Sequence, residues 1–270
     1  MTAAPNLRPL ATMPDEARRA IRGVLADIDD TLSTHGRLTA EAYAALQRLR
    51  ESGRLVIPIT GRPAGWCDHI ARMWPVDAVV GENGALYMRY DDATRRLVRH
   101  YAVDDTTRLV DRTRLAAIGE RIVATVPGCA LASDQRYRES DLAIDFREDV
   151  APLPRAAVER IVALMEAEGL TAKVSSIHVN GWFGAYDKLA MTRTLLGEAF
   201  GIDLDRDEAR FVYAGDSPND APMFAFFANA VGVANVREFA DRIPTLPAYV
   251  TQREAGAGFA ELVDFLLAGE

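Results

Sequence analysis

The sequence has few cysteines and no long apolar run. Its two cysteines, Cys67 and Cys129, lie far apart in a chain of 270 residues. Without CxxC spacing they predict neither a disulfide framework nor a zinc site, and a reducing compartment fits best. Prolines interrupt the segment from Met1 to Arg19, which has no apolar core of signal-peptide length. No apolar stretch approaches the ~20 residues of a membrane span. We therefore expect a cytoplasmic protein with no membrane partner.

The composition is typical of a globular protein with a sizeable core. Hydrophobic residues make up 49% of the chain and charged residues 26%, which excludes disorder and collagen-like structure. The chain has 31 Lys and Arg against 39 Asp and Glu, giving a formal charge of −8. Because this charge repels polyphosphate backbones, nucleic acid is not an expected partner. A small anion can bind only where local cations or a metal ion reverse the sign.

Short apolar runs alternate with helical patterns at both ends of the chain. Strands are predicted at 23–26, 55–59 and 78–80, with helices beginning after Thr39 and near Pro63. The alternation resumes at Asp187 with a helix over 188–200, strands at 211–214 and 230–233, and a last helix from about Phe259. This pattern predicts an α/β fold, a Rossmann-like parallel sheet covered on both faces.

The interval between these two parts has another pattern. Strand-like segments at 86–90 and 97–101 flank a turn and predict an antiparallel hairpin. The rest predicts an α+β module, with helices at 106–126 and 152–168 and strands at 142–146, 172–176 and 177–180. We therefore predict a core in two parts, 1–86 and 187–270, and an inserted α+β cap at 87–186 with hinges near 85–86 and 185–186.

Three predicted strands end in polar residues. Asp27 and Asp29 follow the first strand, Thr60 and Gly61 follow the second, and Gly215-Asp216-Ser217-Pro218-Asn219-Asp220 follows a strand near the C-terminus. An isolated Asp-Asp-Thr sequence is more often a turn or a helix cap. In open α/β sheets, however, ligands bind outside the carboxyl ends of the strands, so these three sets can converge on one crevice.

These segments resemble the four motifs of the haloacid dehalogenase (HAD) superfamily. Asp27-Ile28-Asp29-Asp30-Thr31-Leu32 resembles its DxDxT motif, and Ile59-Thr60-Gly61-Arg62 resembles its second motif. Lys188 and the Gly215–Asp220 segment resemble the third motif and the GDxxND form of the fourth. The position of the insert resembles the C2-capped, type IIB branch, which includes Cof-like sugar phosphatases and sucrose-phosphate phosphatase. The resemblance covers about residues 21 to 265.

The resemblance implies roles for the carboxylates. Asp27 would be the nucleophile that forms an aspartyl phosphate, and Asp29 the acid and base. A Mg²⁺ ion would be held by Asp27, the backbone carbonyl of Asp29 and Asp216, with Asp220 completing the acidic set. The charge argument agrees, since three carboxylates beside a phosphate dianion require a strong local cation.

Other residues are candidates for binding phosphate. The Thr60 hydroxyl and the Gly61 amide precede a helix N-terminus, where anions bind favourably. Lys188 would hold Asp27 and a phosphoryl oxygen together. Asn83 lies in Glu82-Asn83-Gly84-Ala85, which resembles the NGA element of this branch; it either faces the phosphate or only forms a turn.

The sequence indicates less clearly which residues contact the rest of the substrate. Arg62 and Asn219 adjoin the motifs and are candidates. Arg136 and Arg138 lie in a polar cap loop, Gln135-Arg136-Tyr137-Arg138, which is either a solvated loop or the part that recognises the leaving group. The motifs identify neither that leaving group nor the oligomeric state.

The leading hypothesis is a Mg²⁺-dependent phosphatase acting on a small phosphorylated metabolite, expected to be a sugar phosphate. One alternative is a phosphomutase of the same branch, similar to phosphomannomutase. Another is a non-catalytic sugar-phosphate sensor, which could lose Asp29 at little cost. Because the chain keeps every catalytic carboxylate, the sequence favours an enzyme.

Overall fold

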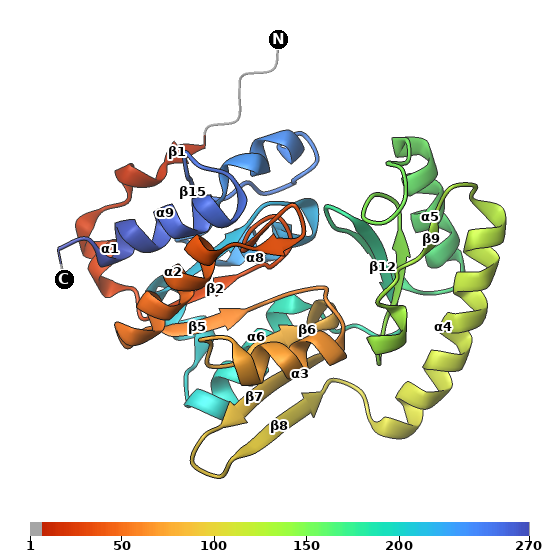
Figure 1. The fold of residues 1–270 in the computed structure, drawn as a ribbon, viewed down its shortest axis with the longest axis horizontal. Helices are drawn as coiled ribbons and strands as arrows, with labels where there is room; N and C mark the ends of the chain where they lie inside the picture. The colour runs from red at the N-terminus through yellow and green to blue at the C-terminus, as the bar shows by residue number, and fades with distance from the viewer. Residues whose placement is uncertain (1–6, 270) are drawn as a thin grey trace.

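The computed structural model describes residues 7–269, so the first six residues of the N-terminal segment and Glu270 lie outside the described residues. Its largest sheet has six parallel strands in the order β1-β15-β14-β13-β2-β5. In that order the strands are Arg8–Pro9, Tyr249–Val250, Val231–Gly232, Phe211–Gly215, Gly23–Ala26 and Leu55–Pro58. Figure 1 shows helices on both sides of this sheet. The predicted α/β class is confirmed.

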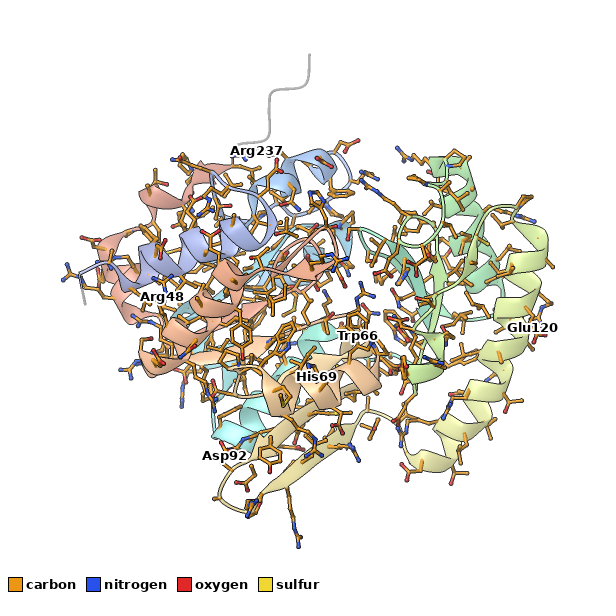
Figure 2. All side chains as sticks on the ribbon, in the orientation of Figure 1. Arg48, Trp66, His69, Asp92, Glu120 and Arg237 are labelled. Carbon is orange, nitrogen blue, oxygen red and sulfur yellow. The ribbon has the colours of Figure 1, made fainter. Side chains whose placement is uncertain are left out.

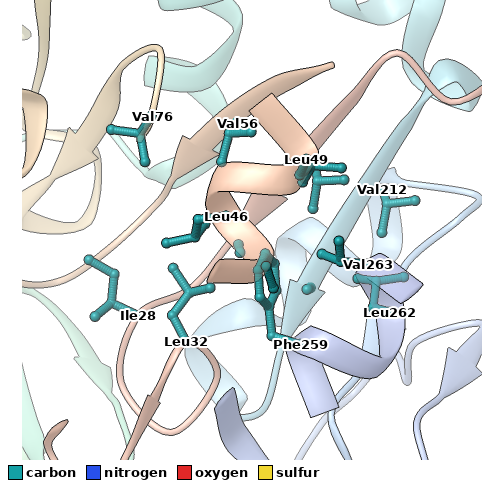
Figure 3. Packing of buried hydrophobic residues seen from close by; sticks show 14 of the residues in the cluster. Ile28, Leu32, Leu46, Leu49, Val56, Val76, Val212, Phe259, Leu262 and Val263 are labelled. Carbon is teal, nitrogen blue, oxygen red and sulfur yellow. The ribbon is translucent and has the colours of Figure 1, made fainter. Parts of the chain in front are cut away.

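The strands are buried on both faces, which explains their continuous apolar runs. Val24 and Ala26 of β2 pack into the apolar cluster beneath α2 (Ala40–Glu51), α3 (Ala64–Met73) and α9 (Ala255–Leu267). Figure 3 shows Leu46 and Leu49 of α2 in this cluster near Leu262 and Val263 of α9. The intervening Leu25 packs into the cluster with α6 (Lys188–Phe200) and α8 (Ala221–Phe226).

Side-chain caps begin two of these helices. Thr39 caps α2, as predicted, because its Oγ1 accepts a hydrogen bond from the Ala42 amide at 3.2 Å. Asp187 caps α6 by accepting from the Ala190 amide at 2.7 Å. The second cap places Lys188 in the first turn of α6. The core also contains the short helices α1 (Asp15–Ala20) and α7 (Leu204–Asp207) and the small hairpin of β3 (Ser33–Thr34) and β4 (Arg37–Leu38).

The predicted hairpin forms, but it is attached to the core. β7 (Leu86–Asp91) and β8 (Arg96–Tyr101) form an antiparallel sheet with β6 (Val79–Gly81), which itself adjoins the main sheet through a parallel bridge between Ile59 and Val80. Leu86 and Met88 pack into the same apolar cluster as α3. The boundary predicted between residues 86 and 87 therefore falls inside a three-stranded sheet.

The cap lies to the right of the core in Figure 1. It contains α4 (Asp105–Thr125), α5 (Arg155–Ala167) and a sheet in the order β11-β12-β10-β9. Its strands are Thr171–Val174, His178–Trp182, Leu142–Asp145 and Ala130–Leu131, in the same order. The helices and one face of the sheet enclose an apolar cluster of their own, which includes Ile144 and Val179. Figure 2 shows Glu120 on the outer face of α4, away from the core.

Within residues 7–269, none of the helices combines the length and apolar character that a membrane crossing requires.

Candidate active site

The predicted polar residues meet at the carboxyl edge of the main sheet. β2 and β13 are neighbours in register, with Ala26 opposite Ala214. The chain runs from β2 to β5 on one side and from β13 to β14 and β15 on the other, so the strand order reverses between β2 and β13. Such a switch point opens a crevice at the strand ends. Asp27 follows β2 and Asp216 follows β13, so both begin at this crevice.

Three buried carboxylates and one lysine form the centre of the site. Asp27, Asp216 and Asp220 have carboxylate oxygens that all lie within 4.8 Å of one another. Lys188 Nζ lies 2.8 Å from Asp27 Oδ1 and 2.8 Å from Asp220 Oδ1. Burial raises the pKa of Asp27 to about 7; Lys188 opposes this rise, and Asp220 adds to it. Carboxylates whose pKa is shifted by burial and by nearby charges are common at functional sites.

Asp220 has little capacity left for a further ligand. Besides Lys188, its Oδ1 accepts from the Tyr213 hydroxyl, and its Oδ2 accepts from the amides of Asp216 and Ser217 at 3.1 and 3.2 Å. A Cβ at Gly215 would lie 2.6 Å from Asp220 Oδ2, so only glycine permits this close approach. The contacts give Asp220 a positioning role, in which it holds Lys188 and the turn that presents Asp216.

Asp216 retains the capacity to bind a cation. Among the residues that the structure describes, the side chains that donate to its carboxylate are neutral, Thr31 Oγ1 at 3.1 Å and Asn235 Nδ2 at 3.3 Å. Burial and the neighbouring Asp220 and Asp27 raise its pKa well above the usual range. A cation beside Asp27 and Asp216 would offset this repulsion, and carboxylate oxygens suit Mg²⁺. The residues present therefore fit a magnesium ion.

Asp29, the predicted acid and base, is clamped by Arg62. Arg62 Nε lies 3.0 Å from each Asp29 carboxylate oxygen, and its Nη2 lies 2.8 Å from Oδ1. The guanidinium also reaches the cap, where Nη1 lies 3.2 Å from Asp134 Oδ2 and 3.2 Å from Glu148 Oε2. Arg62 is 3% exposed, and its ring-face contact is Trp66, with Cζ 4.5 Å from the centroid. Arg62 thus ties the catalytic edge to the cap.

The predicted phosphate-binding segment is rigidly held. Thr60 Oγ1 accepts from the Arg62 amide at 3.0 Å, and the Thr60 carbonyl accepts from the Asn83 amide at 3.1 Å. Asn83 is buried beside Gly61, and its Nδ2 lies 3.3 Å from Asp141 Oδ2 of the cap. Gly84 has a φ of +104°, and a Cβ there would overlap the Asp187 carbonyl. This close approach brings the Asn83 turn against the start of α6.

A second buried network joins core and cap, and it was not predicted from the sequence. Glu82 is fully buried, and its carboxylate accepts from the α3 amide of Ala64 and from the cap amides of Glu139, Ser140 and Asp141. Burial and the nearby Asp141 raise the pKa of Glu82 to about 7, against the effect of Arg138 and the amides. Its position next to Asn83 was the one signal available.

The cap arginines and Asn219 have different surroundings. Arg138 is buried, and its guanidinium donates to Asp134, Asp141 and the Gly61 carbonyl. It therefore braces the predicted phosphate-binding loop, whereas the sequence suggested either a solvated position or a contact with the leaving group. Arg136 is exposed, and its Nη2 lies 2.6 Å from the Tyr137 hydroxyl. Asn219, a candidate substrate contact, accepts from Ser217 Oγ at 2.7 Å and lines a small space with Asp27 and Asp29.

Cavities surround the carboxylates. The space directly between Asp27, Asp29 and the cap measures about 10 Å³, so the cap leaves little room over Asp27. Cavities of about 200 Å³ beside Lys188 and about 240 Å³ beside Asp29 adjoin it. A larger one of about 610 Å³ between cap and core includes Phe146 and Pro218 but none of the predicted catalytic residues. The two smaller cavities are therefore the candidates for the leaving group.

Comparisons with known proteins agree with this geometry. A model of haloacid dehalogenase-like hydrolases matches residues 24–112. A phosphoglycolate phosphatase from Pyrobaculum neutrophilum is 29% identical over 250 residues, covering 91% of this chain and 96% of the relative.

Solved structures share the fold at low identity. A crystal structure of a Thermoplasma acidophilum protein aligns with a TM-score of 0.68 at 16% identity, covering 91% of this chain and 98% of that one. A sugar phosphatase of HAD subclass IIB aligns with a TM-score of 0.59 at 13% identity, covering 89% and 96%. The chain is therefore similar to haloacid dehalogenase-like hydrolases over residues 24–112 and, over most of its length, to curated phosphatases, which are phosphoric monoester hydrolases.

Proposed function

We propose that the protein is a Mg²⁺-dependent phosphatase that hydrolyses a small phosphorylated metabolite through an aspartyl phosphate. The observation that carries the proposal is the contact of Lys188 Nζ with both Asp27 and Asp220, beside the uncompensated carboxylate of Asp216. This arrangement orients one carboxylate as a nucleophile and leaves another able to bind a cation.

Asp27 attacks phosphorus in the first step. A bond forms between an Asp27 carboxylate oxygen and phosphorus while the bond from phosphorus to the ester oxygen breaks. Lys188 holds Asp27 in place and offers positive charge to the phosphoryl oxygens, while Thr60 and the Gly61 amide bind the phosphate. A Mg²⁺ ion, when bound by Asp27, the Asp29 carbonyl and Asp216, would supply charge stabilisation for the transferring phosphoryl group.

Asp29 moves the protons. It gives a proton to the departing alkoxide and later removes one from the water that attacks the aspartyl phosphate, which releases phosphate and restores Asp27. In the structure Arg62 donates to both Asp29 oxygens, which orients this side chain at the sheet edge. Because Arg62 also contacts Asp134 and Glu148, the cap offers it alternative acceptors while Asp29 carries a proton.

The leaving group is a small molecule of one of two classes. A sugar is the class expected from the sequence, and it agrees with the name of the structural relative in subclass IIB. A short hydroxy acid agrees with relatives named phosphoglycolate phosphatases. Cavities of about 200 and 240 Å³ favour a small leaving group of either class.

Phosphate release from a panel of phosphorylated sugars and hydroxy acids tests the proposal. We expect turnover with Mg²⁺, none with EDTA, and little recovery with Ca²⁺, whose larger and looser coordination shell would misplace the phosphoryl group. Asp27→Asn should abolish turnover while the protein stays folded, because an amide does not attack phosphorus. Full activity in EDTA, or near wild-type turnover by Asp27→Asn free of deamidation, would contradict the mechanism.

A further inference from the structure

The cap sheet has one apolar and one polar face, and the polar face covers the catalytic edge. Along β12, Val179 packs into the apolar cluster of the cap, whereas Asn180 lines the small space with Asp27 and Asp29. Lys173 of β11 lies directly opposite Asn180 in antiparallel register. Because opposed residues of an antiparallel pair share a face, the Lys173 side chain stands on the side that covers the active site.

Lys173 also lines the 200 Å³ cavity beside the catalytic lysine. The wall of this cavity includes Lys173, Lys188, Asn83 and Asn219, with the aromatic rings of Trp182 and Tyr186. Within residues 7–269, no acidic side chain forms an ion pair or hydrogen bond with Lys173. The one acidic residue among the lining side chains, Asp187, points its carboxylate at the Ala190 amide to cap α6. Because Lys188 is already paired with Asp27 and Asp220, Lys173 is the cation of this cavity that remains for an anion.

The neighbouring cavity of about 240 Å³ has the opposite character. Its wall includes Asp29, Asp30 and Glu148, against Arg62 and Arg147. Arg62 is already engaged by Asp29 and Glu148, which leaves one arginine for any anion that enters. An anionic group would be repelled there and attracted beside Lys173.

The basic residues of the chain add a second observation. Of the 31 Lys and Arg residues, only Lys173 and Lys188 are lysines. Arginine forms most of the surface ion pairs and the buried bridges at Arg62 and Arg138, while both lysines line this one cavity. A lysine ammonium is a compact charge with three rotatable donors, which suits a small anion that must enter and leave.

We propose that Lys173 binds a carboxylate on the leaving group, so that the preferred substrate is the phosphate monoester of a short hydroxy acid. The inference rests on the proposed phosphatase function and makes Lys173 a specificity residue, with no part in the displacement. Lys188 and Asn83 hold the phosphoryl end of the cavity, and Lys173 holds the carboxylate end. This assigns to Lys173 the task that the sequence had suggested for Arg136 and Arg138.

The test compares kcat and KM for 2-phosphoglycolate, ethyl phosphate and 2-aminoethyl phosphate, esters of similar size whose leaving groups are negative, neutral and positive. Lys173→Gln should lower kcat/KM for 2-phosphoglycolate by about 10- to 100-fold, mainly through KM, as expected for loss of a charge-assisted hydrogen bond. Turnover of ethyl phosphate should stay within about 3-fold. Lys173→Arg should restore much of the loss, and Lys173→Glu should favour the aminoethyl ester. Arg147→Gln is the matched control, an exposed cap cation beside the other cavity.

Equal losses on the charged and the neutral ester would overturn the inference, as would a selective loss in Arg147→Gln instead of Lys173→Gln. Titration calorimetry of 2-phosphoglycolate with Asp27→Asn protein, with and without Lys173→Gln, separates the two proposals. If binding depends on Lys173 but the wild-type protein releases no phosphate, the phosphatase proposal is overturned and the binding role of Lys173 stands. Binding that ignores Lys173 would overturn the specificity role.

Discussion

Glu148 provides the most direct test of how the cap is held on the core. Its carboxylate lies in the cap, 3.2 Å from Arg62 Nη1 of the core and 2.9 Å from His178 Nε2. Burial alone would raise its pKa, but hydrogen bonds from His178 and Arg62 outweigh burial and lower the pKa from 4.5 to about 2. Ionised Glu148 therefore stabilises the folded, capped protein.

The magnitude follows from that shift. A decrease from 4.5 to about 2 corresponds to roughly 3 kcal/mol of differential stabilisation. The side chain is 23% exposed, so solvent screening reduces this, and we expect Glu148→Gln to cost about 2 kcal/mol at pH 7. Because the pKa is lower in the folded protein, the contribution is present above about pH 4.5 and is lost as the pH falls toward 2. By about pH 3.5 the difference should be a little over half its neutral value.

Urea unfolding followed by tryptophan emission measures this, since Trp66 packs against Arg62. Figure 2 shows Trp66 on α3. Glu159→Gln is the matched control, because Glu159 pairs with Arg155 at 2.7 Å on the surface, and such pairs contribute less than about 1 kcal/mol. The reasoning fails if Glu148→Gln matches the control at pH 7, or if its deficit does not shrink between pH 7 and pH 3.5.

Two further predictions concern the acid–base residue and the turn at Gly84. Asp29→Asn should slow turnover by ~10² to 10⁴, and more for an alkyl phosphate than for an activated aryl phosphate; equal losses on the two esters in steady-state assays would count against the acid role. Gly84→Ala should lower the free energy of unfolding by more than twice as much as Gly53→Ala does. Both glycines have a positive φ, but only a Cβ at Gly84 would overlap another chain segment. Gly53→Ala should cost about 1 kcal/mol, and similar urea midpoints for the two variants would show that the Asp187 backbone yields.

The core strands and the meeting of polar residues at the sheet edge could be predicted because their signals are local. A buried parallel strand is a short apolar run, and a polar residue directly after it marks the carboxyl edge of the sheet. The helix at 188–200 was predicted with its observed bounds. Asp27, Asp216, Asp220 and Lys188 come together because each is fixed by the end of one such element.

The attachment of the hairpin could not be predicted in the same way. The alternation in 86–90 and 97–101 indicates two paired strands but not the third strand that they join. That choice depends on Val79 pairing with Met88 and on Leu86 fitting against α3, which are contacts between segments rather than properties of either. Strand-pairing partners are decided by tertiary packing.

The buried charges between core and cap could not be predicted from the sequence either. Arg62 and Arg138 were both predicted to be possible substrate contacts, yet Arg138 is fully engaged by Asp134, Asp141 and the Gly61 carbonyl. Glu82 accepts hydrogen bonds from backbone amides that lie about 60 residues further along the chain. Nothing in the local pattern distinguishes an arginine that awaits a ligand from one that is buried against acids, because the difference is made by the segment that packs on top of it.

The charges gathered at the sheet edge explain why a cation on the cap matters to the choice of substrate. Four carboxylates, those of Asp27, Asp29, Asp216 and Asp220, face two cations, Lys188 and Arg62. A divalent metal ion would balance this excess, but a phosphate dianion then restores two negative charges, and a proton on Asp29 removes only one. A carboxylate on the leaving group would add another negative charge near these groups, and like charges repel. Lys173 lies where it can offset that charge, whereas a neutral sugar would leave this cation without a partner in the cavity. Without Lys173, the balance of charge would therefore repel an acidic leaving group, and with Lys173 the site can accommodate one carboxylate.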